Sequence, residues 1–206
     1  MGKIIVSTNM SLDGVVEDPT GGEGFRHGGW FDQMLGEDRE AWAKVEFEEA
    51  LGAAALLMGR RSYEFFASRW AGRGGEWADR LRELPKYVFS STLTEPGWSN
   101  SVVLAGDVGE EVSKLKQKVD GEIIVYGSRL LISALIDNDL VDELRLIIVP
   151  IVLGDGERIF DETDEKKPLR LLSSRTLGKG LVFVSYQLIA EDAIPAIDPA
   201  LTERVA

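Results

Sequence analysis

The chain has 206 residues, of which 44% are hydrophobic, and carries a formal net charge of -12 at pH 7. This length suits one domain with a short extension, and the absence of cysteine excludes disulfides, thiolate metal sites and cysteine nucleophiles. The acidic charge and the lack of any long apolar run argue against nucleic-acid and membrane partners, so we expect a cytoplasmic protein.

The N-terminal half predicts a strand followed by alternating helices and strands. Apolar runs predict strands over residues 3–10, 53–58 and 87–89, the first ending at a turn that contains Asp13 and Gly14. Helices are predicted over residues 39–51, 60–70 and 77–84. In the first of these helices the expected apolar face consists of Ala43, Phe47, Ala50 and Leu51.

The next segment repeats an order of strand, glycine and helix. Residues 102–105 predict a strand, and Asp107 with Glu110 resembles a capping box that opens a helix through Val119. A short buried strand over 123–126 is then followed by Gly127 and a helix over 128–138. This order is typical of a parallel α/β sheet.

The C-terminal third has a different pattern. The run 143–153 and two strands around residues 177–180 predict a hairpin that is added antiparallel to a mainly parallel sheet. Pro150 indicates a bulge or an edge within this run. The strand pattern ends near Glu191, so we expect a domain over residues 1–190 and a C-terminal extension over residues 191–206.

Two strand-glycine-helix junctions are candidate phosphate sites. The first junction is Gly59-Arg60-Arg61-Ser62 and the second is Gly127-Ser128-Arg129. Unpaired N–H groups and the helix dipole attract anions at such places, and arginine side chains can grip a terminal phosphate. However, such turns are common in α/β proteins and paired arginines are usually solvated surface residues. The first strand lacks the G-x-G-x-x-G pattern, so a Rossmann site is not indicated.

Five segments in one order carry a resemblance to a known family. They are residues 10–14 (MSLDG), 57–64 (LMGRRSYE), 86–93 (KYVFSSTL), 125–131 (VYGSRLL) and 140–160 (LVDELRLIIVPIVLGDGERIF). Together they resemble the dihydrofolate-reductase-like family, of the type found in the C-terminal reductase domain of RibD, a riboflavin-biosynthesis enzyme. The zinc-binding pattern of a deaminase does not occur, so we expect a stand-alone reductase-like domain.

The resemblance implies a three-layer α/β fold and NADPH as the cofactor. It implies that Gly59, Arg60, Arg61 and Ser62 form the phosphate-binding turn for NADPH, with Arg60 near the adenosine 2′-phosphate, and that Ser90 and Ser91 flank the adenosine. It places Gly127, Ser128, Arg129 and Leu130 at the pyrophosphate. Many family members have two glycines at this last turn, whereas this chain has Gly127 followed by Ser128.

The resemblance also places the substrate near the end of the first strand. Asp13 is the first candidate for a catalytic proton donor and Asp32 the second, although Asp13 suits an ordinary turn equally well. Trp30 and Phe31 are either core anchors or a stacking surface for a planar substrate, and are assigned with Asp32, Gly154 and Asp155 to substrate binding. His27 lies in a glycine-rich stretch and is expected to be solvated.

The expected function is NADPH-dependent reduction of a small pterin-like, pyrimidine-like or other molecule by hydride transfer. The alternative is an NADP(H)-binding module without catalytic activity, and a hydrolase is disfavoured because one histidine and no cysteine cannot build its usual sites.

Glu46, Glu48 and Glu49 are interpreted as a solvated helix face and not as a metal site. We also expect a homodimer, because the apolar run 146–153 needs cover on both faces.

Overall fold

The computed structural model of the chain describes residues 1–160, 166–190 and 193. These residues form an 8-stranded sheet in the order β4-β3-β2-β5-β1-β6-β8-β7. Among them, no helix is both long and apolar enough to span a membrane. The expected extension over 191–206 lies outside the described residues except for residue 193.

The sheet is parallel from β4 to β6, and β8 runs antiparallel to its neighbours β6 and β7. The strands are β1 (Lys3–Ser11), β2 (Ala53–Gly59), β3 (Lys86–Phe89), β4 (Ser101–Leu104), β5 (Glu122–Tyr126), β6 (Val141–Val149), β7 (Leu169–Leu177) and β8 (Leu181–Leu188). The predicted mainly parallel sheet with a C-terminal antiparallel hairpin is therefore confirmed.

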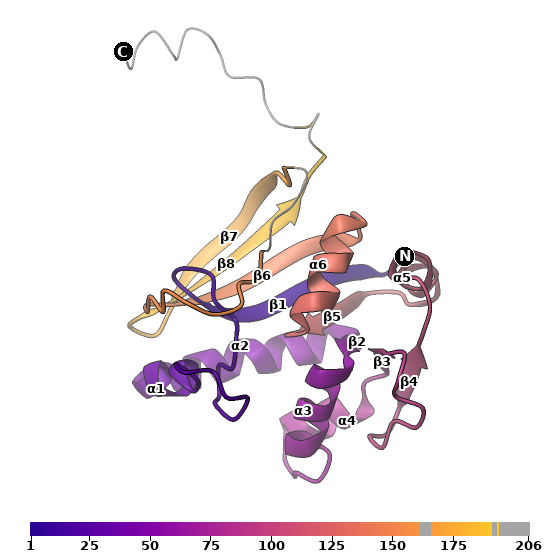
Figure 1. The fold of residues 1–206 in the computed structure, drawn as a ribbon, viewed down its shortest axis with the longest axis horizontal. Coiled ribbons are helices and arrows are strands. Elements are labelled where there is room, and N and C mark those ends of the chain that lie inside the picture. Colours follow the sequence, from indigo (N-terminus) through magenta and orange to yellow (C-terminus); the bar gives the residue numbers. More distant parts are fainter. Residues whose placement is uncertain (161–165, 191–192, 194–206) are drawn as a thin grey trace, which may run out of the picture.

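Helices cover both faces of the sheet and make the fold three-layered (Figure 1). The helices are α1 (Trp30–Leu35), the 3-10 helix η1 (Gly36–Asp38), α2 (Arg39–Gly52), α3 (Arg60–Trp70), α4 (Glu76–Glu83), α5 (Val108–Lys118) and α6 (Arg129–Asp137). The apolar residues of α5 and α6 pack on one face, and those of α1 to α4 pack on the other. Asp107 caps α5 as expected, since its side chain accepts the N–H of Glu110 at 2.9 Å.

Three local expectations are corrected by the structure. β6 ends at Val149 and not at residue 153, because Pro150 cannot donate to the sheet ladder. The segment 30–38, for which the sequence predicts no helix, forms α1 and η1. In α2 the buried residues are Val45, Glu46, Glu49 and Ala50, so Glu46 and Glu49 are not on a solvated face.

The loop between β1 and α1 folds around a buried aspartate. The Oδ2 atom of Asp18 accepts the N–H groups of Glu23 and Phe25, and its backbone oxygen accepts the N–H of Gly29 at 2.9 Å. This arrangement holds the glycine-rich stretch 21–29 at the carboxyl end of β1. His27 is exposed there, as expected.

Candidate functional site

The two predicted glycine junctions lie side by side at the carboxyl edge of the sheet. β2 and β5 are parallel neighbours; β2 ends at Gly59 and β5 ends directly before Gly127. The chain continues into α3 on one face of the sheet after β2, and into α6 on the opposite face after β5. Such a divergence is a topological switch point, where open α/β sheets bind their ligands. Two helix N-termini therefore meet at one place.

A hydrogen bond ties these two turns together. The Oγ atom of Ser128 accepts the backbone N–H of Gly59 at 2.9 Å and donates to the backbone oxygen of Tyr126 at 3.2 Å. A Cβ atom added to Gly127 would lie 3.2 Å from Oγ of Ser62 in the first turn of α3. The two turns are thus in direct contact.

Ser128 occupies the position where many relatives of the expected family have a second glycine. Its φ of +65° lies in the left-handed region, directly after Gly127 with a φ of +55°. This conformation costs a non-glycine residue of order 1 kcal/mol. The two hydrogen bonds of the Ser128 hydroxyl offset part of that cost. The turn therefore adopts a left-handed conformation at two successive residues without a second glycine.

The cationic side of the site is open to solvent. Arg60 and Arg61 are both exposed at the start of α3, and Arg60 lies 4.0 Å from Glu64 one helical turn away. At the end of the adjacent β3, the buried Oγ of Ser90 accepts the N–H groups of the two residues that follow Ser91. Ser90 therefore shapes its own turn, while Ser91 is exposed beside the first junction.

The α6 side of the site is partly occupied by contacts within the chain. Nε of Arg129 donates to Glu157 at 2.8 Å, so this guanidinium is engaged with the loop after β6. Leu130 is 69% exposed and leaves an apolar surface beside the turn. The first-turn N–H groups of α6 remain the anion-attracting feature, because they lack partners within the helix.

Asp13 ties two loops together at the end of β1. Its carboxylate accepts the hydroxyl of Ser11 at 2.7 Å and the N–H groups of Leu153 and Gly154 at 3.1 and 2.8 Å. The Ser11 bond, followed by the two backbone bonds, lowers the pKa of Asp13 to about 2. An acid ionised at neutral pH has no proton to give, so Asp13 does not fit the expected proton donor. It fits the alternative role of a turn residue.

Of the two roles expected for Trp30 and Phe31, the structure shows the core anchor and not the exposed stacking surface. Trp30 is 1% and Phe31 3% exposed, and both pack in a core with residues of β6 and β8. The Trp30 indole donates to the backbone oxygen of Glu17 at 2.8 Å. Both residues are therefore core anchors, because burying their apolar surface stabilises the fold, whereas leaving it exposed beside a loop does not.

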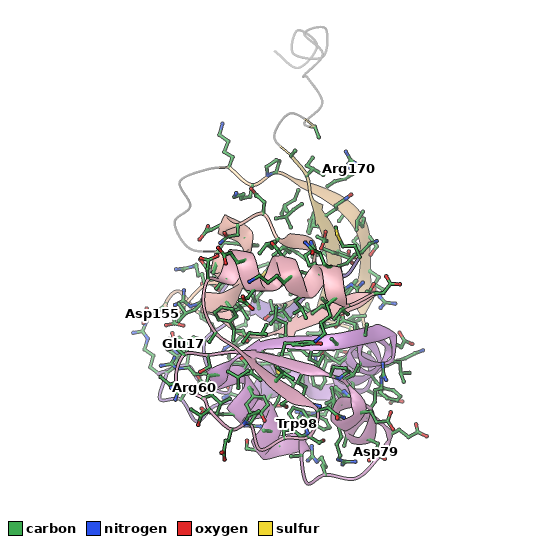
Figure 2. All side chains as sticks on the ribbon, turned by 90° about the vertical axis from the view of Figure 1, so that its right-hand side faces the viewer. Glu17, Arg60, Asp79, Trp98, Asp155 and Arg170 are labelled. Atoms are coloured by element: carbon green, nitrogen blue, oxygen red, sulfur yellow. The ribbon has the colours of Figure 1, made fainter. Side chains whose placement is uncertain are left out.

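The remaining predicted substrate residues lie at the surface around the same edge. Asp32 pairs with Arg39 at 3.0 Å, and Asp155 pairs with Arg26 at 3.1 Å, in both cases between exposed side chains. Gly154 is held by Asp13. Figure 2 shows Asp155, Glu17 and Arg60 on one side of the molecule, with Arg170 at its far end. The loops therefore border the edge where the two junctions meet.

Sequence reasoning missed a buried polar cluster beneath α2. The Trp42 indole donates to Oδ1 of Asn9 at 3.1 Å, near the end of β1. Deeper in the same layer, Glu46 and Glu49 are buried near the Tyr126 hydroxyl, whose pKa they help to raise. The spacing of Trp42, Glu46 and Glu49 on one helical face was the available signal. Within the described ranges, no group of three or more His, Cys, Asp and Glu residues could hold a metal ion.

The sequence profile of the RibD C-terminal domain matches residues 2–183 of the chain. The chain belongs to this family. The match confirms the resemblance that the five ordered segments carried. A relative is the uncharacterized protein YyaP of Bacillus subtilis (strain 168), which is 33% identical over 138 residues, covering 64% of this chain and 72% of that one.

Solved structures share the fold of this RibD C-terminal domain. A putative riboflavin biosynthesis protein from Shewanella sp. PV-4 matches with a TM-score of 0.64 and 20% identity, covering 91% of this chain and 99% of that one. Dihydrofolate reductase from Enterococcus faecalis, complexed with NADP(H) and RAB-propyl, matches with a TM-score of 0.60 and 13% identity, over 91% and 97% of the chains. The expected dihydrofolate-reductase-like fold is confirmed.

Proposed function

We propose that the chain is an NADPH-dependent reductase that transfers a hydride to a small heterocycle of the pterin or pyrimidine type, or to another small molecule. One observation carries this proposal: two helix N-termini meet at the switch point of the sheet and are joined by the bond between Gly59 and Ser128. Membership in the RibD C-terminal family and the likeness to a dihydrofolate reductase that was solved with NADP(H) support it.

The residues at this place fit the phosphates of a dinucleotide. The first turn of α6 offers backbone N–H groups to the pyrophosphate, and Arg60 and Arg61 at the first turn of α3 offer guanidinium groups to the 2′-phosphate. Ser91 is exposed at the end of the adjacent strand, where the adenosine would lie. When bound, NADPH supplies the hydride, while the protein binds, orients and protonates the acceptor.

The alternative is a module that binds NADP(H) without chemistry, and the state of Asp13 favours it. The proton donor expected at the mouth of the site is ionised, with a pKa of about 2. A screen of NADPH oxidation against pterins, pyrimidines, quinones and aldehydes separates the two functions. A reductase consumes NADPH with one acceptor class, whereas a binding module leaves it unchanged with all of them.

The choice of NADPH over NADH tests the assignment of the cofactor site. A partly exposed contact between a guanidinium and the 2′-phosphate stabilises the complex by roughly 1.5–3 kcal/mol, which is a preference of about ten- to a hundredfold. We expect Arg60→Ala to lose most of this preference, and we expect the preference of the wild type to weaken with added salt. Calorimetric titration of both cofactors measures these affinities.

Arg170→Ala is the matched control, because Arg170 is also exposed but lies at the far end of the molecule (Figure 2). We expect this variant to bind both cofactors as the wild type does. An equal loss of NADPH and NADH affinity in Arg60→Ala, or a wild type without NADPH preference, contradicts the assignment.

A further inference from the structure

The surface along α3 has a charge opposite to that of the whole chain. Residues 60–73 contain four arginines and one glutamate, in a chain with a net charge of -12. Arg60, Arg61, Arg69 and Arg73 are all exposed. Arg60 and Arg61 belong to the proposed phosphate site, whereas Arg69 and Arg73 lie at the other end of the helix. The proposed site therefore leaves this second pair of cations without a role.

Carboxylates neutralise other exposed arginines of the chain, but not this pair. Arg26, Arg39 and Arg82 lie 3.1, 3.0 and 2.6 Å from the carboxylate of an aspartate. Within the part of the chain that the structure describes, neither Arg69 nor Arg73 forms an ion pair with a carboxylate. Their two positive charges are therefore available to an anion that approaches from solvent.

Aromatic rings hold the two guanidinium groups in place. The Arg69 guanidinium lies 3.6 Å from the centroid of the Phe65 ring, and the Arg73 guanidinium lies 5.3 Å from that of Trp70. Nη2 of Arg69 also lies 3.5 Å from the hydroxyl oxygen of Thr20. A ring attracts a cation but carries no net charge, so it fixes the position of the cation without cancelling its field.

The length of α3 separates this pair from the phosphate site. The helix begins at Arg60 and Arg69 is its next-to-last residue, so their Cα atoms lie about 14 Å apart along the axis at 1.5 Å per residue. This distance is too long for Arg69 to share a hydrogen-bonded phosphate with Arg60. It is shorter than the Debye length of about 30 Å at 10 mM salt, so the charges still act on an anion there.

We propose that Arg69 and Arg73 guide NADPH to the phosphate site electrostatically, which speeds its association, and that they do not contact the bound cofactor. The proposal rests on the proposed function. NADPH carries about four negative charges on its three phosphates, so the net charge of the chain repels it at long range. A cationic surface beside the phosphate turn offsets this repulsion locally and directs the anion toward Arg60.

Stopped-flow measurement of NADPH fluorescence gives the association and dissociation rate constants of the full chain. We expect the double variant Arg69→Gln, Arg73→Gln to associate about threefold more slowly than the wild type at 10 mM salt. At 150 mM salt the difference falls below about 1.5-fold, because the Debye length shortens to about 8 Å. The dissociation rate constant stays unchanged. NADH lacks the 2′-phosphate and shows a smaller effect.

Three further variants separate local charge from other causes. Lys166→Gln with Arg170→Gln removes the same charge near the far end of the molecule (Figure 2) and keeps the wild-type rates. Arg69→Lys with Arg73→Lys keeps both charges and therefore keeps the association rate. Ser68→Lys adds a cation to the exposed face of the same helix and speeds association at 10 mM salt, which a folding defect cannot do.

The outcomes distinguish this proposal from the proposed function. If the wild type binds no NADPH, the proposed function fails and the guidance fails with it. If the wild type binds NADPH and the double glutamine variant associates as fast at 10 mM salt, the guidance alone is refuted. If that variant instead dissociates faster, Arg69 or Arg73 contacts the bound cofactor, and the guidance is refuted while the cofactor site stands.

Discussion

Ser128 shows how one side chain substitutes for a glycine at the switch point. Replacement by alanine keeps the left-handed backbone conformation but removes the bonds to Gly59 and Tyr126. Replacement by glycine removes the same bonds but also relieves the backbone strain. We therefore expect Ser128→Ala to lower the free energy of unfolding by about 1–2 kcal/mol, and Ser128→Gly to change it by less than about 1 kcal/mol.

Urea unfolding of both Ser128 variants measures this difference. Ser68→Ala is the control, because the Ser68 hydroxyl bonds only within its own exposed helix, to Phe65 at 2.8 Å. Equal losses in the alanine and glycine variants would show that the backbone conformation of Ser128 carries no strain.

Residue types at the ends of strands were predictable, but the directions of their side chains were not. Glycine before a helix is a local signal, so the two junctions could be located before the fold was known. Trp30 and Asp13 depend on contacts more than a hundred residues away, with β8 and with Gly154. Their burial and ionisation are therefore set by tertiary structure, which no local pattern records.

At the scale of an element, α2 shows the limit of periodicity. The predicted apolar face included Leu51, which is 54% exposed, whereas the helix buries Glu46 and Glu49. Apolar spacing cannot identify a face that packs through carboxyl groups, because those residues count as polar. By contrast, the end of β6 at Pro150 and the cap of α5 follow from backbone chemistry that the residues themselves determine.

The buried glutamate of α2 makes stability depend on pH. The pKa of Glu46 is raised from 4.5 to about 8, so the folded chain keeps a proton that the unfolded chain loses between these values. The stabilisation from this group is therefore present at low pH and is lost as the pH rises to about 8. Glutamine cannot ionise, so we expect Glu46→Gln to be more stable than the wild type at pH 9, by at least about 1 kcal/mol.

Urea unfolding at pH 5 and pH 9 measures this effect as a difference between variant and wild type. Lys86 has a pKa lowered by burial to about 8, but its contribution cancels because both proteins contain it. Glu48→Gln should show no change between the two pH values. A Glu46→Gln variant that is less stable than the wild type at pH 9 would show that Glu46 is ionised and stabilising.

For the whole molecule, the mainly parallel sheet with its C-terminal antiparallel hairpin was predictable, but the way in which its long apolar run is covered was not. The alternation of strand, glycine and helix repeats along the chain, and each unit adds a parallel strand with its helix. The homodimer was expected because the run 146–153 needed cover. In the structure, Leu146 and Ile147 are buried on opposite faces within the same chain. That reason is therefore wrong, while the dimer itself stays a prediction.

The sheet edge at β7 is a better reason to expect a homodimer. One side of β7 pairs with β8, and the strand forms the edge of the sheet over 9 residues. Leu169, Leu171 and Leu172 are exposed on it. An exposed edge strand leaves backbone N–H and C=O groups that can pair with another chain, and antiparallel pairing of two β7 strands would give a closed twofold dimer. We expect light scattering at micromolar concentration to give the dimer mass.

Leu171→Lys places a charge on the edge and should give monomers, whereas Leu51→Lys, at an equally exposed leucine of α2, should leave the dimer intact. A wild-type monomer, or a dimer that survives Leu171→Lys, excludes β7 as the interface.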